Sequence, residues 1–133
     1  MKKNRNTILI LLVLSATFIV SILFFYVYKD HRDIGQEEAS FTMSVNELHR
    51  QFQTNDSLAN ATYVDKTILV SGLVSSIDKI NKAMTLNEKL FLTFNSTDGL
   101  DIQPQKLVKI KGRFVGYDDL MEELKMDQCI LIK

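Results

Sequence analysis

The stretch Thr67-Ile68-Leu69-Val70-Ser71-Gly72-Leu73-Val74 decides the fold of this chain. Its residues are mostly β-branched or apolar, a composition that favours a β-strand. Gly72 stands inside the stretch, and a glycine within a strand indicates a bulge or a sharp bend. Residues 108–116 show the same features, because they alternate apolar and polar side chains and contain two glycines. Two bent strands predict a sheet that curls into a small barrel.

Three shorter segments supply the remaining strands. Residues 82–86 and 90–94 are β-type runs on either side of Asn87-Glu88, which we expect to form a hairpin connection. Residues 128–132 form a final apolar run. The predicted fold is therefore mainly β, within the α+β class: a five-stranded, partly open barrel of the OB type.

A short helix is predicted to precede the barrel. Ser44 and Glu47 have the spacing of a capping box, with the serine at the cap and the glutamate three residues later. An apolar stripe follows at intervals of three and four residues: Val45, Leu48 and Phe52. His49 lies off this stripe, so we expect it at the surface.

The first part of the chain predicts a membrane anchor. Residues 8–28 are 21 residues without a charge, and a helix of that length spans about 30 Å, the thickness of the hydrocarbon core of a bilayer. Tyr26 and Tyr28 lie at the far end, where a tyrosine ring suits the membrane interface. The length of the apolar run favours a retained anchor over a cleaved signal peptide, whose apolar region is shorter.

Basic residues on the two sides of the anchor predict its orientation. Lys2, Lys3 and Arg5 precede the span, while Lys29 and Arg32 follow it. The excess before the span favours a cytoplasmic N-terminus. We therefore expect a single-pass protein of the cytoplasmic membrane with its C-terminal domain in the periplasm. The predicted parts are a basic segment (1–7), the transmembrane anchor (8–28), a solvated linker (29–43) and the OB-fold domain (44–133).

Several segments together resemble one family. The shared segments are Asn60-Ala61-Thr62-Tyr63, Lys66 to Gly72, Val108 to Phe114 and a final strand that contains Cys129. They are similar to the bacterial OB-fold family called tRNA-anti-like, over residues 44–133. The resemblance implies an OB fold on a lipidated or membrane-anchored protein, without an established enzymatic activity. The chain lacks the acylated cysteine of the lipoprotein members, so its anchoring depends on the apolar run.

The chain shows no pattern that predicts catalysis. Cys129 is the only cysteine and lies in an apolar run, so we interpret it as a small buried hydrophobe. The histidines His31 and His49 stand in no recognisable motif. We interpret the acidic pairs at 118–119 and 122–123 as a solvated turn. We therefore expect a non-enzyme without a metal or other cofactor, with an unrecognised hydrolase as a further alternative.

The hairpin at residues 82–94 carries the predicted ligand site. A two-residue turn would pair Met84 with Phe91 and place four residues on one face: Lys82, Met84, Lys89 and Phe91. The other face of the second strand would then fill the core with Leu90, Leu92 and Phe94. An aromatic ring beside lysines can stack on a base or hold an anionic chain. A register shift of one residue would exchange the two faces.

Charge bears on the choice of ligand. From Ser44 to the end, the chain has 11 basic and 12 acidic residues. A nucleic-acid binder usually has a basic excess, because phosphate neutralisation supplies much of its affinity. The leading hypothesis is therefore a membrane-anchored, non-catalytic OB-fold binding module of the bacterial cell envelope, with an unknown protein or small molecule as ligand. The alternative is a domain that binds single-stranded nucleic acid.

Overall fold

The computed structural model describes residues 2–27 and 32–133. It divides the chain into two compact units, Met1–Arg32 and Asp33–Lys133. Four residues of the predicted anchor and linker lie outside the described residues: Tyr28, Lys29, Asp30 and His31.

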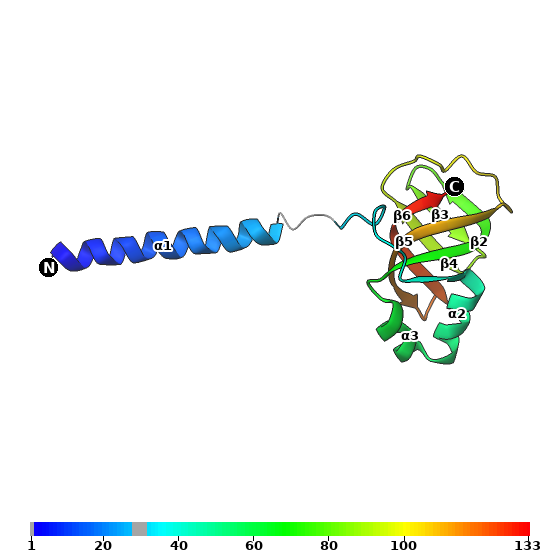
Figure 1. Cartoon of the computed structure of the whole chain (residues 1–133), viewed down its shortest axis with the longest axis horizontal. Helices are drawn as coiled ribbons and strands as arrows, with labels where there is room; N and C mark the ends of the chain where they lie inside the picture. The colour runs from blue at the N-terminus through cyan, green and yellow to red at the C-terminus, as the bar shows by residue number, and fades with distance from the viewer. Residues whose placement is uncertain (1, 28–31) are drawn as a thin grey trace. The chain divides into compact units, whose positions relative to one another are not determined.

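The first unit contains one helix, α1 (Lys2–Val27), drawn in blue in Figure 1. Its residues Asn4–Val27 are long and apolar enough to cross a membrane, with a hydropathy of 3.0. The hydroxyl groups of Ser15 and Thr17 donate to carbonyl oxygens of the preceding turn, so they need no partner inside a bilayer. The helix is therefore a candidate membrane span, although a signal sequence near the N-terminus can meet the same criteria of length and hydropathy.

The second unit is built on a closed β-barrel of five strands (Figure 1). The strands are β2 (Thr67–Asp78), β3 (Ala83–Leu86), β4 (Leu90–Phe94), β5 (Leu107–Asp118) and β6 (Glu123–Ile132). They pair in the order β2-β3-β4-β6-β5, and β5 pairs back onto β2 to close the ring. All neighbours are antiparallel except β4 and β6, which are parallel. The predicted OB-type barrel is confirmed, and the ring is closed.

The glycines of the two long strands lie where other side chains approach the backbone. A Cβ atom on Gly72 would lie 2.9 Å from Cγ2 of Val45, and one on Gly112 would lie 2.7 Å from Sγ of Cys129. The strand registers shift within a few residues of each glycine. The two glycines therefore allow the barrel wall to bend and to pack closely on its neighbours.

Two helices lie together at one end of the barrel (Figure 1). The first, α2 (Val45–Thr54), begins at Ser44, whose Oγ accepts a hydrogen bond from the Glu47 amide at 3.2 Å. The second, α3 (Asp56–Tyr63), begins at Asn55, whose side chain caps it in the same way at 3.1 Å. The helix cap predicted at Ser44 is therefore present.

The buried face of α2 is wider than the predicted apolar stripe. It includes His49, which is only 6% exposed, so the expectation of a surface histidine was wrong. The reason is that the imidazole ring packs edge-on against Tyr117 of β5, with ring centroids 5.9 Å apart. Phe52 packs on the same strand, 5.2 Å from Phe114 and 5.5 Å from Tyr117. Aromatic contacts thus fix α2 on β5.

The folded unit begins before the boundary expected at Ser44. The strand β1 (Phe41–Ser44) pairs in parallel with the start of β2 and adds a sixth strand to the sheet. Ile34 also belongs to this unit, because it is only 3% exposed. Part of the segment interpreted as a solvated linker is therefore folded.

Residues 33–40, here called the strap, lie against the outside of the barrel. The Nζ of Lys111 on β5 donates to the carbonyl oxygens of Gly35 and Glu37, at 2.8 and 3.0 Å. A Cβ atom on Gly35 would lie 3.9 Å from the side chain of Ile130 on β6. The strap therefore covers part of the outer face of β5 and β6.

Candidate ligand face of the barrel

The β3–β4 hairpin determines which side chains face outward. Leu86 pairs with Leu90, so the connection has three residues instead of two: Asn87, Glu88 and Lys89. The first two adopt the left-handed region, with φ of 52° and 57°. The additional residue shifts the register by one, and the predicted pairing of Met84 with Phe91 is wrong.

Met84 lies in the core instead of on the outer face. It pairs with Leu92, and the two residues are 1% and 0% exposed. The predicted core residues of β4 are all buried: Leu90, Leu92 and Phe94. The inward face of β4 was thus predicted correctly, whereas that of β3 was not.

Phe91 lies on the outer face of β4, at the centre of a row across three strands. It pairs with Thr85 on β3 and with Lys125 on β6, and it is partly exposed. Lys125 could not be predicted as part of this face from the sequence, because the parallel pairing of β4 with β6 joins residues that lie far apart in the chain. An outward aromatic ring between a hydroxyl and an ammonium group is a suitable contact point for a ligand.

The two other predicted site residues lie at opposite ends of the hairpin. Lys82 precedes β3, and its Nζ donates to the carbonyl oxygen of Asn95 at 3.2 Å. Lys89 lies in the turn before β4, and its Nζ donates to Oδ1 of Asn46 at 3.3 Å. The structure therefore places Phe91 between these lysines along the hairpin, and the four predicted residues do not form one cluster.

Two loops of the same construction lie at the two ends of β4. Residues 79–82 join β2 to β3 near the end of β4, and residues 119–122 join β5 to β6 near its start. Each loop follows an aspartate whose Oδ1 accepts two backbone hydrogen bonds: Asp78 from Ile80 and Asn81, and Asp118 from Leu120 and Met121. Each loop ends at a residue with left-handed φ: Lys82 at 52° and Glu122 at 51°.

The two loops present similar apolar tips but opposite charges. Ile80 is 93% exposed and Leu120 is 98% exposed, each two residues after the capping aspartate. Residues 79–82, here called the basic loop, contain two lysines: Lys79 and Lys82. Residues 119–122, here called the acidic loop, contain two carboxylates: Asp119 and Glu122. A ligand that lies along β4 would therefore meet a different charge at each end.

Local hydrogen bonds keep the capping aspartates ionised. A backbone amide of its own loop is the main cause of the lowered pKa of Asp78. The Nζ of Lys125, at 3.1 Å, is the main cause of the lowered pKa of Asp118. Lys79 forms a surface ion pair with Asp101. These carboxylates hold the loops in shape, and such a lowered pKa does not suit a proton donor at neutral pH.

A hollow of about 440 Å³ opens beside the acidic loop. Its lining comprises Val115, Gly116, Tyr117, Asp118, Asp119, Leu120 and Lys125. The pKa of Tyr117 is raised, first by burial and then by the charges of Glu122 and Asp119, so its hydroxyl group stays protonated. Since Lys125 also pairs with Phe91, the hollow adjoins the outer face of β4.

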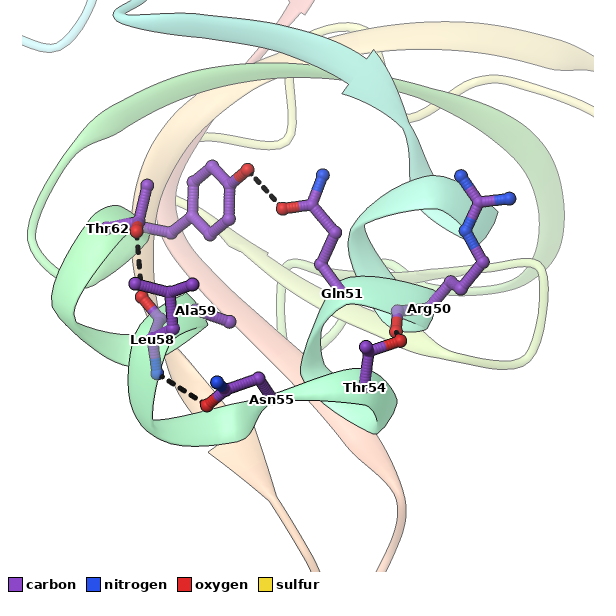
Figure 2. A pocket seen from close by; sticks show the side chains of 8 residues that line it. Arg50, Gln51, Thr54, Asn55, Leu58, Ala59 and Thr62 are labelled. Atoms are coloured by element: carbon purple, nitrogen blue, oxygen red, sulfur yellow. Dashed lines mark hydrogen bonds between the residues drawn. The ribbon is translucent and has the colours of Figure 1, made fainter.

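A second hollow, of about 250 Å³, lies between α2 and α3 (Figure 2). Its polar side chains mainly join the two helices. The Tyr63 hydroxyl group donates to Oε1 of Gln51, and Oδ1 of Asn55 accepts from the Leu58 amide. These bonds explain its polar lining without a ligand, so we place the candidate site on β4.

The histidine and the cysteine of the second unit are buried. His49 packs under Tyr117, and its Nε2 has no hydrogen-bond partner within the described part of the chain. Burial raises the pKa of the Cys129 thiol, which keeps it protonated and unreactive. Within residues 2–27 and 32–133, no group of three metal-binding side chains comes together.

Comparison with known proteins identifies a family and a related fold. The model of the tRNA_anti-like family matches residues 1–128. Among solved structures, the chain is similar to a proposed nucleic acid-binding lipoprotein from Klebsiella pneumoniae, with a TM-score of 0.54 and 20% identity. That match covers 69% of this chain and 91% of the other, and at this identity it shows the fold alone.

A more distant match is a proposed aspartyl-tRNA synthetase from Leishmania major. Its TM-score is 0.44 and its identity 14%, over 74% of this chain and 22% of the other. No curated protein matches the chain.

Proposed function

The chain belongs to the tRNA_anti-like family, and from this premise we propose that it is a membrane-anchored, non-catalytic OB-fold module that binds a protein ligand of the bacterial cell envelope. The proposed binding surface, here called the β4 face, has Phe91 at its centre, with Thr85 and Lys125 beside it. The basic loop and the acidic loop lie at its two ends. The proposed orientation puts this surface outside the cytoplasm.

The observation that carries the proposal is the opposite charge of two loops that are otherwise alike. A single-stranded nucleic acid has a phosphate at every step, so it binds best along a groove that is positive throughout. Asp119 and Glu122 in the acidic loop would repel phosphates at one end of the β4 face. A protein segment can carry both signs of charge, so it can complement both ends.

The exposed apolar side chains of the same surface support a protein ligand. Ile80, Leu120 and Met121 are 93%, 98% and 67% exposed, and Phe91 is partly exposed between the loops. Protein interfaces typically place apolar and aromatic anchors in the middle and charged groups at the rim. The β4 face has the residue types for such an interface.

The apolar helix α1 supports the anchoring part of the proposal. Its described residues can span a bilayer and present no charged side chain between Ile8 and Val27. Lys2, Lys3 and Arg5 precede this stretch, which favours a cytoplasmic N-terminus and a domain on the other side. An anchored domain would meet membrane-bound and envelope proteins more often than free nucleic acid.

A second candidate function is the binding of single-stranded nucleic acid. The Klebsiella pneumoniae protein of similar fold is a proposed nucleic acid-binding lipoprotein. In this chain, Phe91 could stack on a base, and Lys82 and Lys125 could contact phosphates. This function predicts salt-dependent oligonucleotide binding that weakens in Phe91→Ala and in Lys82→Glu. Unchanged binding in both variants would exclude the β4 face as the nucleic-acid site.

Photo-crosslinking in cells tests the ligand class. A photoreactive amino acid replaces Phe91 in the full chain, and in the control it replaces Thr42, an exposed residue of β1. We expect a discrete protein adduct from position 91 that is absent from position 42 and weakened by Leu120→Asp. Nuclease-sensitive adducts would instead support the second candidate. Identical adducts from both positions would contradict the proposed surface.

A further inference from the structure

The seam where β5 pairs back onto β2 carries two exposed leucines. Leu73 on β2 pairs directly with Leu107 on β5, and they are 43% and 66% exposed. Their neighbours Val74 and Val108 are buried in the core, so the leucines point outward. Two adjacent apolar side chains on the outside of a barrel contribute nothing to its core, and they indicate a contact surface.

Lysines surround this leucine pair. Lys109 is exposed on the same face of β5 and pairs with Ser71 on β2 and with Ile132 on β6. Lys106 precedes β5 and Lys133 follows β6, and both are exposed. On the other side of Leu73, the Asn87 amide donates to the Leu73 carbonyl oxygen at 2.9 Å, so the exposed Glu88 lies at the edge of this group and the lysines outnumber the carboxylate. We call the following residues the seam patch: Leu73, Lys106, Leu107, Lys109 and Lys133.

The strap covers the adjoining part of the same outer face. It is held by the bonds from Lys111 to the carbonyl oxygens of Gly35 and Glu37, and its own residue Ile34 is buried. The outer face of β5 is therefore exposed at Leu107 and covered by the strap at Lys111. Within the described residues, the exposed leucines remain available for an external contact.

We propose that the seam patch docks onto the surface of an anionic lipid bilayer. This inference rests on the proposed anchoring of the chain through α1. Leucines can enter the interfacial layer of a bilayer, while lysine stems keep their ammonium groups at the level of the lipid phosphates. Each lysine close to an anionic surface strengthens binding by about fivefold.

Because the chain is anchored, even a weak contact between the seam patch and the bilayer is sufficient for docking. Three lysines and two leucines would bind free vesicles poorly, but a tether converts docking into an intramolecular step with a millimolar effective concentration. An acidic protein would match the charge of the seam patch as well, but it would have to be met by diffusion. A bilayer is always next to an anchored domain, so we assign the seam patch to lipid.

Docking through the seam patch determines where the β4 face points. In the ring β2-β3-β4-β6-β5, one strand separates β4 from each strand of the β2–β5 seam. The β4 face and the seam patch therefore lie on opposite sides of the barrel. With the seam patch on the bilayer, Phe91 faces away from the lipid and is accessible to a partner.

The test uses the full chain in vesicles, with a fluorescent label at position 107. Leu107→Cys supplies the attachment site, because Cys129 is buried and its thiol stays protonated. The vesicles contain phosphatidylcholine, alone or with an equal part of phosphatidylglycerol, and a lipid with a quencher on its headgroup. We expect quenching to be at least about twofold stronger with phosphatidylglycerol. Lys109→Glu should abolish this difference, whereas Lys66→Glu, the same charge change at the exposed residue just before β2, should preserve it.

Two further measurements separate the reasons for a negative result. Flotation of the vesicles reports anchoring: a chain that does not float contradicts both the anchoring and the docking. A chain that floats with position 107 unquenched contradicts the docking alone. A second label at Leu120→Cys, at the other end of β5, should stay unquenched. Quenching at position 120 but not at position 107 would overturn the assigned face, and circular dichroism confirms that each variant is folded.

Discussion

Adding one methyl group at Gly112 tests how closely the barrel wall packs on its last strand. A Cβ atom there would lie 2.7 Å from Sγ of Cys129 and 3.1 Å from both the Asp127 carbonyl oxygen and the Cε of Met126. The sulfur contact is too short to persist, and the backbone oxygen can yield only if β6 moves. Overpacking of this kind costs about 1–3 kcal/mol. We expect Gly112→Ala to lower the free energy of unfolding by about 2 kcal/mol, and Tm by about 8–16 °C.

A double-mutant cycle with Cys129→Ala identifies the cause of this loss. The assay is thermal unfolding of the full chain in detergent micelles, followed by the near-ultraviolet circular dichroism of its tyrosines. Cys129→Ala alone removes a buried sulfur and should cost about 1 kcal/mol. In the double variant the new methyl group can occupy the vacated space, so the combined loss should be at least about 1 kcal/mol smaller than the sum.

The control for this cycle is Gly35→Ala. Its new Cβ would come nearest to the exposed carboxylate of Asp33, at 3.0 Å, which is a flexible neighbour. We expect its effect to be smaller than that of Gly112→Ala and independent of Cys129→Ala. If Gly112→Ala and Cys129→Ala are additive within about 0.5 kcal/mol, the close contact with the sulfur does not limit the packing.

Four further predictions concern stability and binding. Ser44→Ala should cost about 1 kcal/mol in thermal unfolding, because α2 loses its cap; no change would contradict the role of the cap. Arg113→Gln removes a two-pronged contact with Asp127, and it should cost about 1 kcal/mol, less at high salt, since both side chains are about one-third exposed. The lowered pKa of Asp118, due chiefly to its lysine partner, contributes stability that is present above the ordinary value of 3.8 and lost as the pH falls through the lowered value. Asp118→Asn should therefore reduce the acid sensitivity of Tm between about pH 5 and 2, and an unaltered profile would assign that sensitivity to other groups. Phe91→Ala should weaken binding of the proposed protein ligand by about 2 kcal/mol or more, as measured by titration. An unchanged affinity would show that Phe91 is not part of the binding site.

Burial that alternates along a strand could be predicted from the sequence. Leu90, Leu92 and Phe94 alternate with polar or outward residues, so the core face of β4 was correct. The register of β3 was wrong because the turn uses left-handed backbone at Asn87 and Glu88. A glutamate rarely adopts this conformation, so the sequence Asn87-Glu88-Lys89 does not indicate a three-residue turn.

Contacts between distant segments could not be predicted in the same way. His49 on α2 is buried because its ring packs against Tyr117 of the distant strand β5. Ile34 is buried too, although it is a single apolar residue in a charged segment. Neither creates a periodic pattern. The paired loops did leave a signal, since Asp78 and Asp118 each precede an isolated apolar residue by two positions. Their equivalence becomes clear only when the barrel places them at the two ends of β4.

The proposed function depends most directly on which side of the membrane the OB-fold domain faces. Two reporter enzymes fused after Lys133, one active only outside the cytoplasm and one only inside, measure this. We predict activity of the outside reporter, which would expose the β4 face to envelope proteins and keep it from cytoplasmic nucleic acid. Activity of the inside reporter would contradict the envelope role and make single-stranded nucleic acid the leading ligand.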